Sequence, residues 1–306
     1  MSPVSVTTKP QVAQVGEFAE VGQVLGLEPG DHGTWIGRGP QYPWGGLYGG
    51  QIVAQALEAA GATVPEGFDV HSLRAYFIRR GDHEHAVLYE VDPIRDGRSF
   101  ATRRVVAHQV SGAILNLEAS FQRPEASEDI ETVRAPRTVP GPGDLEQSSW
   151  SPLFERAMVP DEVVASLPPR DGQGRALGWF RTVGPPGPRS VDHAAALAYI
   201  SDDLPTDAVF RARIAHRLQR AGADGVGTIR PGSDWPDEDD ASVFTASLDH
   251  TMWFHRPARA DEWHLHDVSC HSFAGGRGLA IGHVFSTDGL HVATLAQEVL
   301  LRHARA

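Results

Sequence analysis

The sequence of 306 residues holds a single cysteine, Cys270. One thiol excludes an internal disulfide framework and a cysteine-rich metal site. Positive charge is also scarce, because 27 Lys and Arg stand against 39 Asp and Glu, for a formal net charge of −12. Nucleic acids and anionic membranes are bound by clustered cations, so this balance argues against either as a partner.

Long apolar runs are missing as well. No segment approaches the roughly 18 apolar residues of a membrane-spanning helix. The first thirty residues lack the basic start, apolar core and small-residue cleavage site of a secretory signal, so we expect a cytoplasmic protein. The 41% hydrophobic and 22% charged content is typical of a globular chain, and the length suits one large or two medium domains.

Several familiar catalytic motifs are absent. The sequence contains no G-x-S-x-G, Walker A, Rossmann or H-E-x-x-H pattern. The glycine-rich stretch 45–50 lacks the lysine of a P-loop. Histidine pairs at 83–85 and 264–266 have no matching third and fourth ligand. The sequence therefore predicts no metal site, and no cofactor is expected.

Hydrophobic periodicity predicts two similar series of elements. Apolar residues at helical spacing indicate a helix over 50–60, followed by extended stretches near 69–79, 86–95, 99–110 and 113–123. The same order returns as a strand at 176–183, a helix near 191–203, and strands near 245–256, 263–272, 277–287 and 290–301. A helix with an antiparallel meander is an α+β unit.

Landmarks in the two series match at a nearly constant offset. Tyr76 corresponds to Trp253 and the turn at Gly112 to that at Gly289, both 177 residues apart, which favours a duplication over two unrelated meanders. We predict an N-terminal domain at 1–124, a proline-rich connector at 125–170 with a short helix near 151–158, and a C-terminal domain at 171–306. An insertion at 211–243 is interpreted as a solvated surface segment, with a lid as the alternative.

Three polar residues stand where apolar ones are expected. Asp202 shares the helical spacing of Ala195 and Ala198 near a helix end. Gln297 interrupts an apolar row on the last strand, and Ser247 begins another strand. A solvated Asp202, a Gln297 that satisfies the backbone and an edge serine are the bland alternatives, and spacing alone does not unite the three.

Five segments resemble the acyl-CoA thioesterase II family, of the TesB type. They are GGQIVAQAL (49–57), HSLRAYF (71–77), DGRSF (96–100), SLDHTMWFHRP (247–257) and AQE (296–298), and the likeness extends over 30–125 and 175–302. The resemblance implies a double hotdog, in which two helices are each wrapped by a curved antiparallel sheet. It also implies an acyl-CoA thioester hydrolase of lipid metabolism and, as in related proteins, a homodimer or larger assembly.

The family's site residues match positions of this chain. Its acid corresponds to Asp202, its hydroxyl residue to Ser247 and its glutamine to Gln297. We expect Asp202 to take a proton from water that Ser247 and Gln297 hold in line. Substrate-binding candidates are the backbone at Gly49 and Gly50, as oxyanion donor, and the guanidinium groups of Arg79 and Arg256, for coenzyme A phosphates.

Two neighbouring histidines are given other interpretations. His71 lies in a family motif, but a packing or hydrogen-bonding role is favoured. Asp249 and His250 are adjacent on a predicted strand and should face opposite sides, so they are not paired as catalytic groups.

Two alternatives to hydrolysis stay open. A hotdog enoyl-CoA hydratase would act on the same acyl thioesters, although its Asp-x-x-x-Asn-Pro-x-His type of motif is not found. A non-catalytic acyl-CoA-binding protein is the second. The length of the acyl chain is not specified by the sequence.

Overall fold

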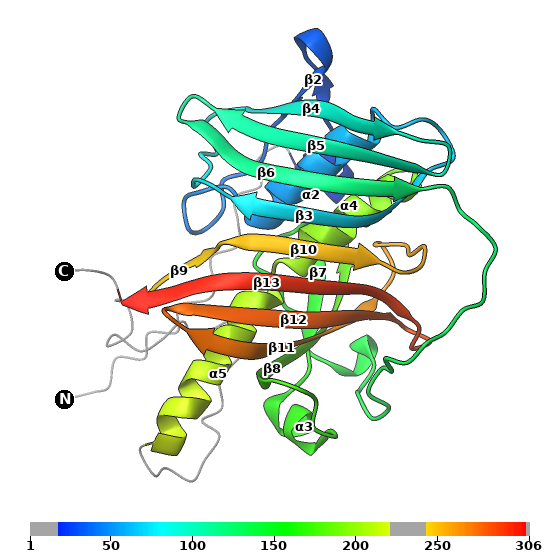
Figure 1. Ribbon diagram of the computed structural model, residues 1–306. Helices are drawn as coiled ribbons and strands as arrows, with labels where there is room; N and C mark the ends of the chain where they lie inside the picture. Colours follow the sequence, from blue (N-terminus) through cyan, green and yellow to red (C-terminus); the bar gives the residue numbers. More distant parts are fainter. Residues whose placement is uncertain (1–17, 221–242, 304–306) are drawn as a thin grey trace.

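The structure is a computed structural model that describes residues 18–220 and 243–303. Its strands form one continuous antiparallel sheet of 13 strands (Figure 1). The first half contributes Glu28–Pro29 (β1), Thr34–Gly37 (β2), Asp69–Phe77 (β3), Val87–Asp96 (β4), Phe100–Gln109 (β5) and Gly112–Gln122 (β6). The second contributes Phe154–Met158 (β7), Gln173–Thr182 (β8), Val243–Ser247 (β9), Asp249–Phe254 (β10), His264–Ala274 (β11), Arg277–Ser286 (β12) and His291–His303 (β13).

Five α-helices accompany the sheet in the described ranges. They are Val21–Leu25 (α1), Gly49–Gly61 (α2), Asp161–Ser166 (α3), Ser190–Ser201 (α4) and Leu204–Arg220 (α5), with short 3₁₀ turns at Asp31–Gly33 and Pro142–Asp144. None of these helices is both long and apolar enough to cross a membrane. The predicted helices near 50–60 and 191–203 are therefore confirmed, as is the order of the strands that follow each.

The sheet is symmetric about the seam between β3 and β10. From the seam outward the order is β3-β6-β5-β4-β2-β1 on one side and β10-β13-β12-β11-β8-β7 on the other (Figure 1). At the seam Asp249 pairs with Tyr76 and Trp253 with Ser72, two pairs that the sequence offset of 177 exchanges. This register confirms that the two halves are repeats related by a pseudo-two-fold axis.

Glycine explains two of the landmarks that mark the repeat. Gly112 and Gly289 adopt φ values of 102° and 86°, in the left-handed region that side chains disfavour. Each closes the turn before the last strand of its half, β6 or β13.

Two expectations about the middle of the chain are wrong. Residues 154–158 form strand β7, paired with β8, and not a short helix. Residues 211–220 continue helix α5 from Leu204, and this helix packs against β8, β11, β12 and β13 and buries Ala208, Val209 and Ala212. That part of the expected solvated insertion is thus attached to the sheet, and residues 221–242 lie outside the described residues.

Helix α2 is buried on all sides because it has two partners. Its apolar stripe contacts β3 to β6, and its other side packs against α4. The polar residues that the helical stripe leaves to solvent, Gln51, Gln55 and Glu58, are consequently buried. Gln51 accepts a hydrogen bond from Tyr42, Gln55 accepts one from Tyr89, and Glu58 pairs with Arg189.

The two central helices run antiparallel at very close range. A Cβ atom on Gly50 would lie 2.3 Å from the carbonyl oxygen of Tyr199, and one on Gly61 would lie 2.7 Å from Val191. Glycine at each end of α2 therefore permits the contact with α4. As a result, the first turn of α2 lies beside the last turn of α4.

We expect Gly50→Ala to destabilise the protein. The new methyl group cannot fit against a backbone carbonyl without moving a helix, and such overpacking costs about 1–3 kcal/mol of unfolding free energy. Urea unfolding followed by circular dichroism measures the loss. Gly143→Ala is the control, because a Cβ atom there meets no atom within 4 Å. Equal stability of the two variants would contradict the close helix contact.

Candidate active site

Asp202 lies where the two central helices meet. It caps the C-terminus of α4 and its side chain is buried. The carboxylate oxygen Oδ2 accepts a hydrogen bond of 2.8 Å from the backbone N–H of Gly50, in the first turn of α2. The dipole of α4 disfavours an anion at this end, whereas that of α2 favours it. The start of α2 thus compensates for the unfavourable position on α4.

Ser247 and Gln297 meet the other carboxylate oxygen. Gln297 Nε2 on β13 donates to Asp202 Oδ1 and to Ser247 Oγ, each at 2.8 Å. Ser247 Oγ at the end of β9 lies 3.3 Å from Asp202 Oδ1 and can donate to it. The three candidates, which are distant in sequence, therefore form one hydrogen-bonded cluster.

The cluster is dry, and this changes the acidity of Asp202. Burial raises the pKa of this carboxyl above its usual value. The nearby His250 and the hydrogen bonds from Gln297, Gly50 and Ser247 act in the opposite direction. A carboxylate with a raised pKa is a stronger base than an exposed one, which suits proton abstraction.

Gly49 brings the start of α2 against the carboxylate. A Cβ atom here would lie 2.7 Å from Asp202 Oδ2 and 3.0 Å from the Phe77 ring. The two glycines expected to supply an oxyanion donor differ, because the Gly50 N–H is already bonded to Asp202. The Gly49 N–H has no hydrogen-bond partner within the described residues.

His250 is a member of the cluster that the sequence reasoning missed. Its Nδ1 lies 2.6 Å from Gln297 Oε1, its Nε2 lies 2.9 Å from Ser201 Oγ, and the residue is fully buried. Asp249 faces the other side, where it accepts a hydrogen bond from the Glu298 N–H, as the alternation of a strand requires. A histidine in line with the buried Met252 on the inner face was the available signal.

Aromatic rings enclose the neighbourhood of Asp202. The Tyr48 ring lies 5.0 Å from Trp150 and 5.1 Å from Tyr199, measured between centroids. Trp150 comes from the predicted connector, and its indole N–H donates to Asp203, next to Asp202. The connector thus contributes to the wall of the site.

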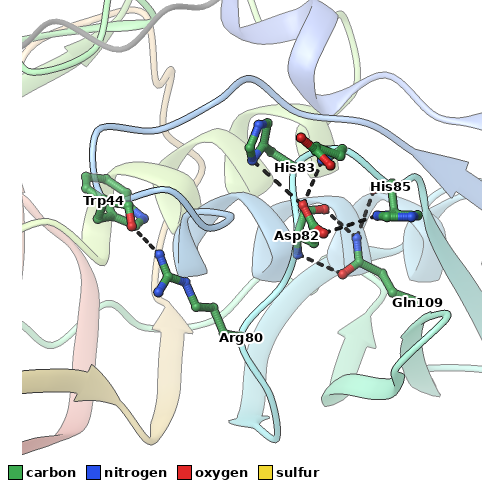
Figure 2. Close-up of polar contacts among 7 residues, drawn as sticks. Trp44, Arg80, Asp82, His83, His85 and Gln109 are labelled. Atoms are coloured by element: carbon green, nitrogen blue, oxygen red, sulfur yellow. Dashed lines mark hydrogen bonds and ion pairs between the residues drawn. The ribbon is translucent and has the colours of Figure 1, made fainter.

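The loop after β3 holds the entry to α2. Figure 2 shows Arg80 donating to the backbone carbonyl of Trp44, and Asp82 contacting His83 and His85. Arg79, one of the predicted phosphate ligands, is exposed beside this loop and donates to the Ala113 carbonyl at 2.7 Å. A guanidinium group is therefore available to solvent near the start of α2.

Arg256 lies far from the cluster. It follows the end of β10 that is opposite to Ser247. Its guanidinium group pairs with Asp129 at 3.1 Å and Glu131 at 3.4 Å, and donates to the His291 carbonyl. These contacts attach the connector to the sheet and give no support to a phosphate-binding role.

The remaining histidines that attract attention have structural contacts. His71 Nε2 lies 2.8 Å from Ser120 Oγ, and its ring packs edge-on against Phe100. Within residues 18–220 and 243–303, no group of three or more His, Cys, Asp or Glu side chains is arranged to hold a metal ion.

Comparison with protein families identifies both halves of the chain. Residues 39–122 match the family described as "Acyl-CoA thioesterase N-terminal domain", and residues 127–301 match "Acyl-CoA thioesterase C-terminal domain". Among named proteins, acyl-coenzyme A thioesterase 8 of Mus musculus is 35% identical, over 92% of this chain and 88% of the mouse protein. Acyl-CoA thioesterase 2 of Haemophilus influenzae is 32% identical, over 91% and 96%.

Solved structures show the same architecture. The acyl-CoA thioesterase II TesB2 of Mycobacterium marinum aligns with a TM-score of 0.75 at 32% identity, over 92% of this chain and 98% of that one. A protein of Alicyclobacillus acidocaldarius described as having a hot dog fold aligns with a TM-score of 0.67 at 21% identity, over 93% and 98%. The predicted α+β double hotdog is confirmed.

We expect the effect of Asp202→Asn on stability to depend on pH. A carboxyl whose pKa is higher in the folded state adds stability below its unfolded pKa of about 3.9, and this is lost as pH rises through the folded pKa. The unfolding free energy of Asp202→Asn relative to the parent should therefore increase with pH above about 4, by on the order of 1 kcal/mol.

Urea unfolding at a series of pH values measures this difference. Asp144→Asn, which removes an exposed carboxylate, controls for the loss of one charge. A relative stability of Asp202→Asn that falls as pH rises would mean that the pKa of Asp202 is lowered in the fold.

Proposed function

The chain belongs to the acyl-CoA thioesterase family of the TesB type, and on that basis we propose that it hydrolyses acyl-CoA to a free acid and coenzyme A. The observation that carries the proposal is the cluster of Asp202, Ser247 and Gln297, in which one buried carboxylate faces a hydroxyl and an amide. A carboxylate so placed can accept the proton of a water molecule that the other two groups orient.

In the proposed reaction the water oxygen attacks the thioester carbonyl carbon while its proton passes to Asp202. The carbonyl π electrons move to oxygen, which becomes the oxyanion of a tetrahedral intermediate. When the carbonyl re-forms, the carbon–sulfur bond breaks and coenzyme A departs as a thiolate. A thiol has a pKa of about 8.5, so departure needs no strong general acid, and Asp202 then releases its proton.

We assign the oxyanion to the backbone N–H of Gly49. The first turn of α2 presents this donor beside the carboxylate, and the helix dipole adds partial positive charge there. Gly50 has the different task of holding Asp202. Ser247 is not assigned as a covalent nucleophile, because its hydroxyl bonds to Gln297 and Asp202 and no histidine contact is seen for it in the described part of the chain.

Arg79 is proposed to meet the phosphates of coenzyme A. It is exposed and follows Phe77, whose ring contacts Gly49. Arg256 is left out of the proposed substrate site because carboxylates of the connector occupy its guanidinium group.

The proposal extends to the organisation of the protein. We propose hotdog domains at 1–124 and 171–306 joined by 125–170, with the qualification that β7 and Trp150 of this joining segment belong to the second half of the sheet and to the site. A cytoplasmic location and a homodimer or larger assembly are proposed from the composition and the family. Sedimentation equilibrium measures the assembly directly.

We expect Asp202→Asn, Ser247→Ala and Gln297→Ala each to lower acyl-CoA hydrolysis by about 10² or more, because each removes the base or a group that orients the water. Release of free thiol from a panel of acyl-CoAs is the assay. Asp144→Asn and Ser272→Ala, at exposed positions, are the matched controls, and thermal melting checks that the variants fold.

The same assay separates the alternatives. Binding of acyl-CoA by the parent protein without thiol release would favour a non-catalytic binding protein. Hydration of enoyl-CoA without thiol release would favour a hydratase. A near-normal rate in Asp202→Asn would remove this residue as the base.

We expect Arg79→Gln to raise KM for acyl-CoA several-fold and to leave kcat nearly unchanged. The same variant should hardly change KM for an acyl-pantetheine, which lacks the nucleotide phosphates, because the contact is with phosphate charge. Steady-state kinetics on the two substrates makes the comparison. Equal effects on both substrates would contradict a phosphate contact.

A further inference from the structure

The hydrogen bonds around Asp202 form a closed ring of side chains. Gln297 connects Asp202 and Ser247 on one side to His250 on the other, and His250 connects to Ser201. Ser201 and Asp202 are consecutive at the end of α4. The ring therefore joins α4, β10 and β13 and returns to the residue beside the one where it began.

The amide of Gln297 has to face one particular way. Its two ends look alike in shape, but only the NH₂ end can donate to a carboxylate and to a serine oxygen at the same time. With Oε1 turned toward Asp202, two acceptors would face each other at 2.8 Å in a buried site. The site works only while Nε2 faces Asp202 and Ser247.

His250 Nδ1 supplies the partner for the other end of the amide. At 2.6 Å from Gln297 Oε1, it satisfies this acceptor only if it carries a hydrogen. The contact to Ser201 allows this in either protonation state. A neutral ring accepts the Ser201 hydroxyl at Nε2, and a charged ring donates to Ser201 Oγ, which itself lies 3.0 Å from the Ala198 carbonyl. In both cases the Nδ1 hydrogen points at Gln297.

We propose that His250 is a positioning residue, which holds the Gln297 amide with its NH₂ group toward Asp202 and Ser247. It does not touch the substrate and takes no proton in the reaction. Its effect is to keep the water-orienting donor in one rotamer, at a distance of one side chain from the chemistry. This inference rests on the proposed function of Asp202, Ser247 and Gln297.

A merely space-filling role would not need this geometry. Met252, two residues along on the same face of β10, is equally buried, and its sulfur lies 3.8 Å from Ser201 Oγ, so a thioether fills the adjoining space. At position 250 both ring nitrogens instead meet polar atoms at 2.6 and 2.9 Å. A buried imidazole with both nitrogens satisfied indicates orientation rather than packing.

Two substitutions separate the two ring nitrogens. Asn places its amide nitrogen near the position of histidine Nδ1, so His250→Asn keeps a donor for Gln297. Gln reaches the position of Nε2, so His250→Gln keeps the contact to Ser201 and leaves Gln297 Oε1 without a donor. We expect His250→Gln to lower kcat about tenfold with KM within about twofold, and His250→Asn to stay within about threefold of the parent.

The outcomes bear on different claims. Equal losses in the two variants, or no loss in either, would overturn the positioning role while leaving hydrolysis by the parent intact. Absence of thiol release by the parent protein would instead remove the proposed function. Thermal melting of each variant shows whether a low rate reflects unfolding.

A second measurement uses the parent protein and does not depend on activity. Long-range ¹H–¹⁵N NMR of histidine reports which ring nitrogen carries hydrogen. We expect His250 to be protonated at Nδ1 near neutral pH, with its signal assigned by loss in His250→Asn. A neutral ring protonated only at Nε2 would overturn the proposal, even if both variants fail to fold.

Discussion

The hydrogen bond from the Gly50 N–H to Asp202 is the constraint on which the site depends. It brings the end of α4 to the start of α2 and offsets the unfavourable dipole of the helix that carries the acid. The absence of a side chain at Gly49 and Gly50 follows from it, because a Cβ atom at either position would collide with Asp202 or with the α4 backbone. Gln297 and Ser247 then reach the free carboxylate oxygen from the sheet.

The pseudo-two-fold axis offers two such places, and only one carries the polar cluster. Counting back 177 residues from His250 gives Leu73, whose neighbour across the β3–β6 ladder is Ala119. Both are buried and apolar. The other end of the helix pair is held instead by Glu58 and Arg189, and burial together with the charge of Asp192 raises the pKa of Glu58 to about 8. The duplication thus yields one proposed catalytic site in each chain.

Sequence patterns predicted what is local or repeated. The helical stripe containing Asp202, the interrupted strand row at Gln297 and the offset of 177 all have a periodicity that can be read along the chain, whereas their union into one site came from family resemblance. Contacts between distant segments have no such signal. The burial of Gln51 depends on α4, and the pairing of Arg256 with Glu131 depends on how the connector crosses the sheet. His250 was missed because its partner, Gln297, lies on another strand.

The fixing of Trp150 and Arg156 of the joining segment on Asp203 has a consequence for how such a chain evolves. In a dimer of identical single-hotdog subunits, no covalent linker would exist to supply these two side chains. Once a fused gene recruited its linker into the wall around the acid, the fusion became irreversible in practice. Neither repeat, separated from that linker and paired with a copy of itself, could rebuild the same chamber.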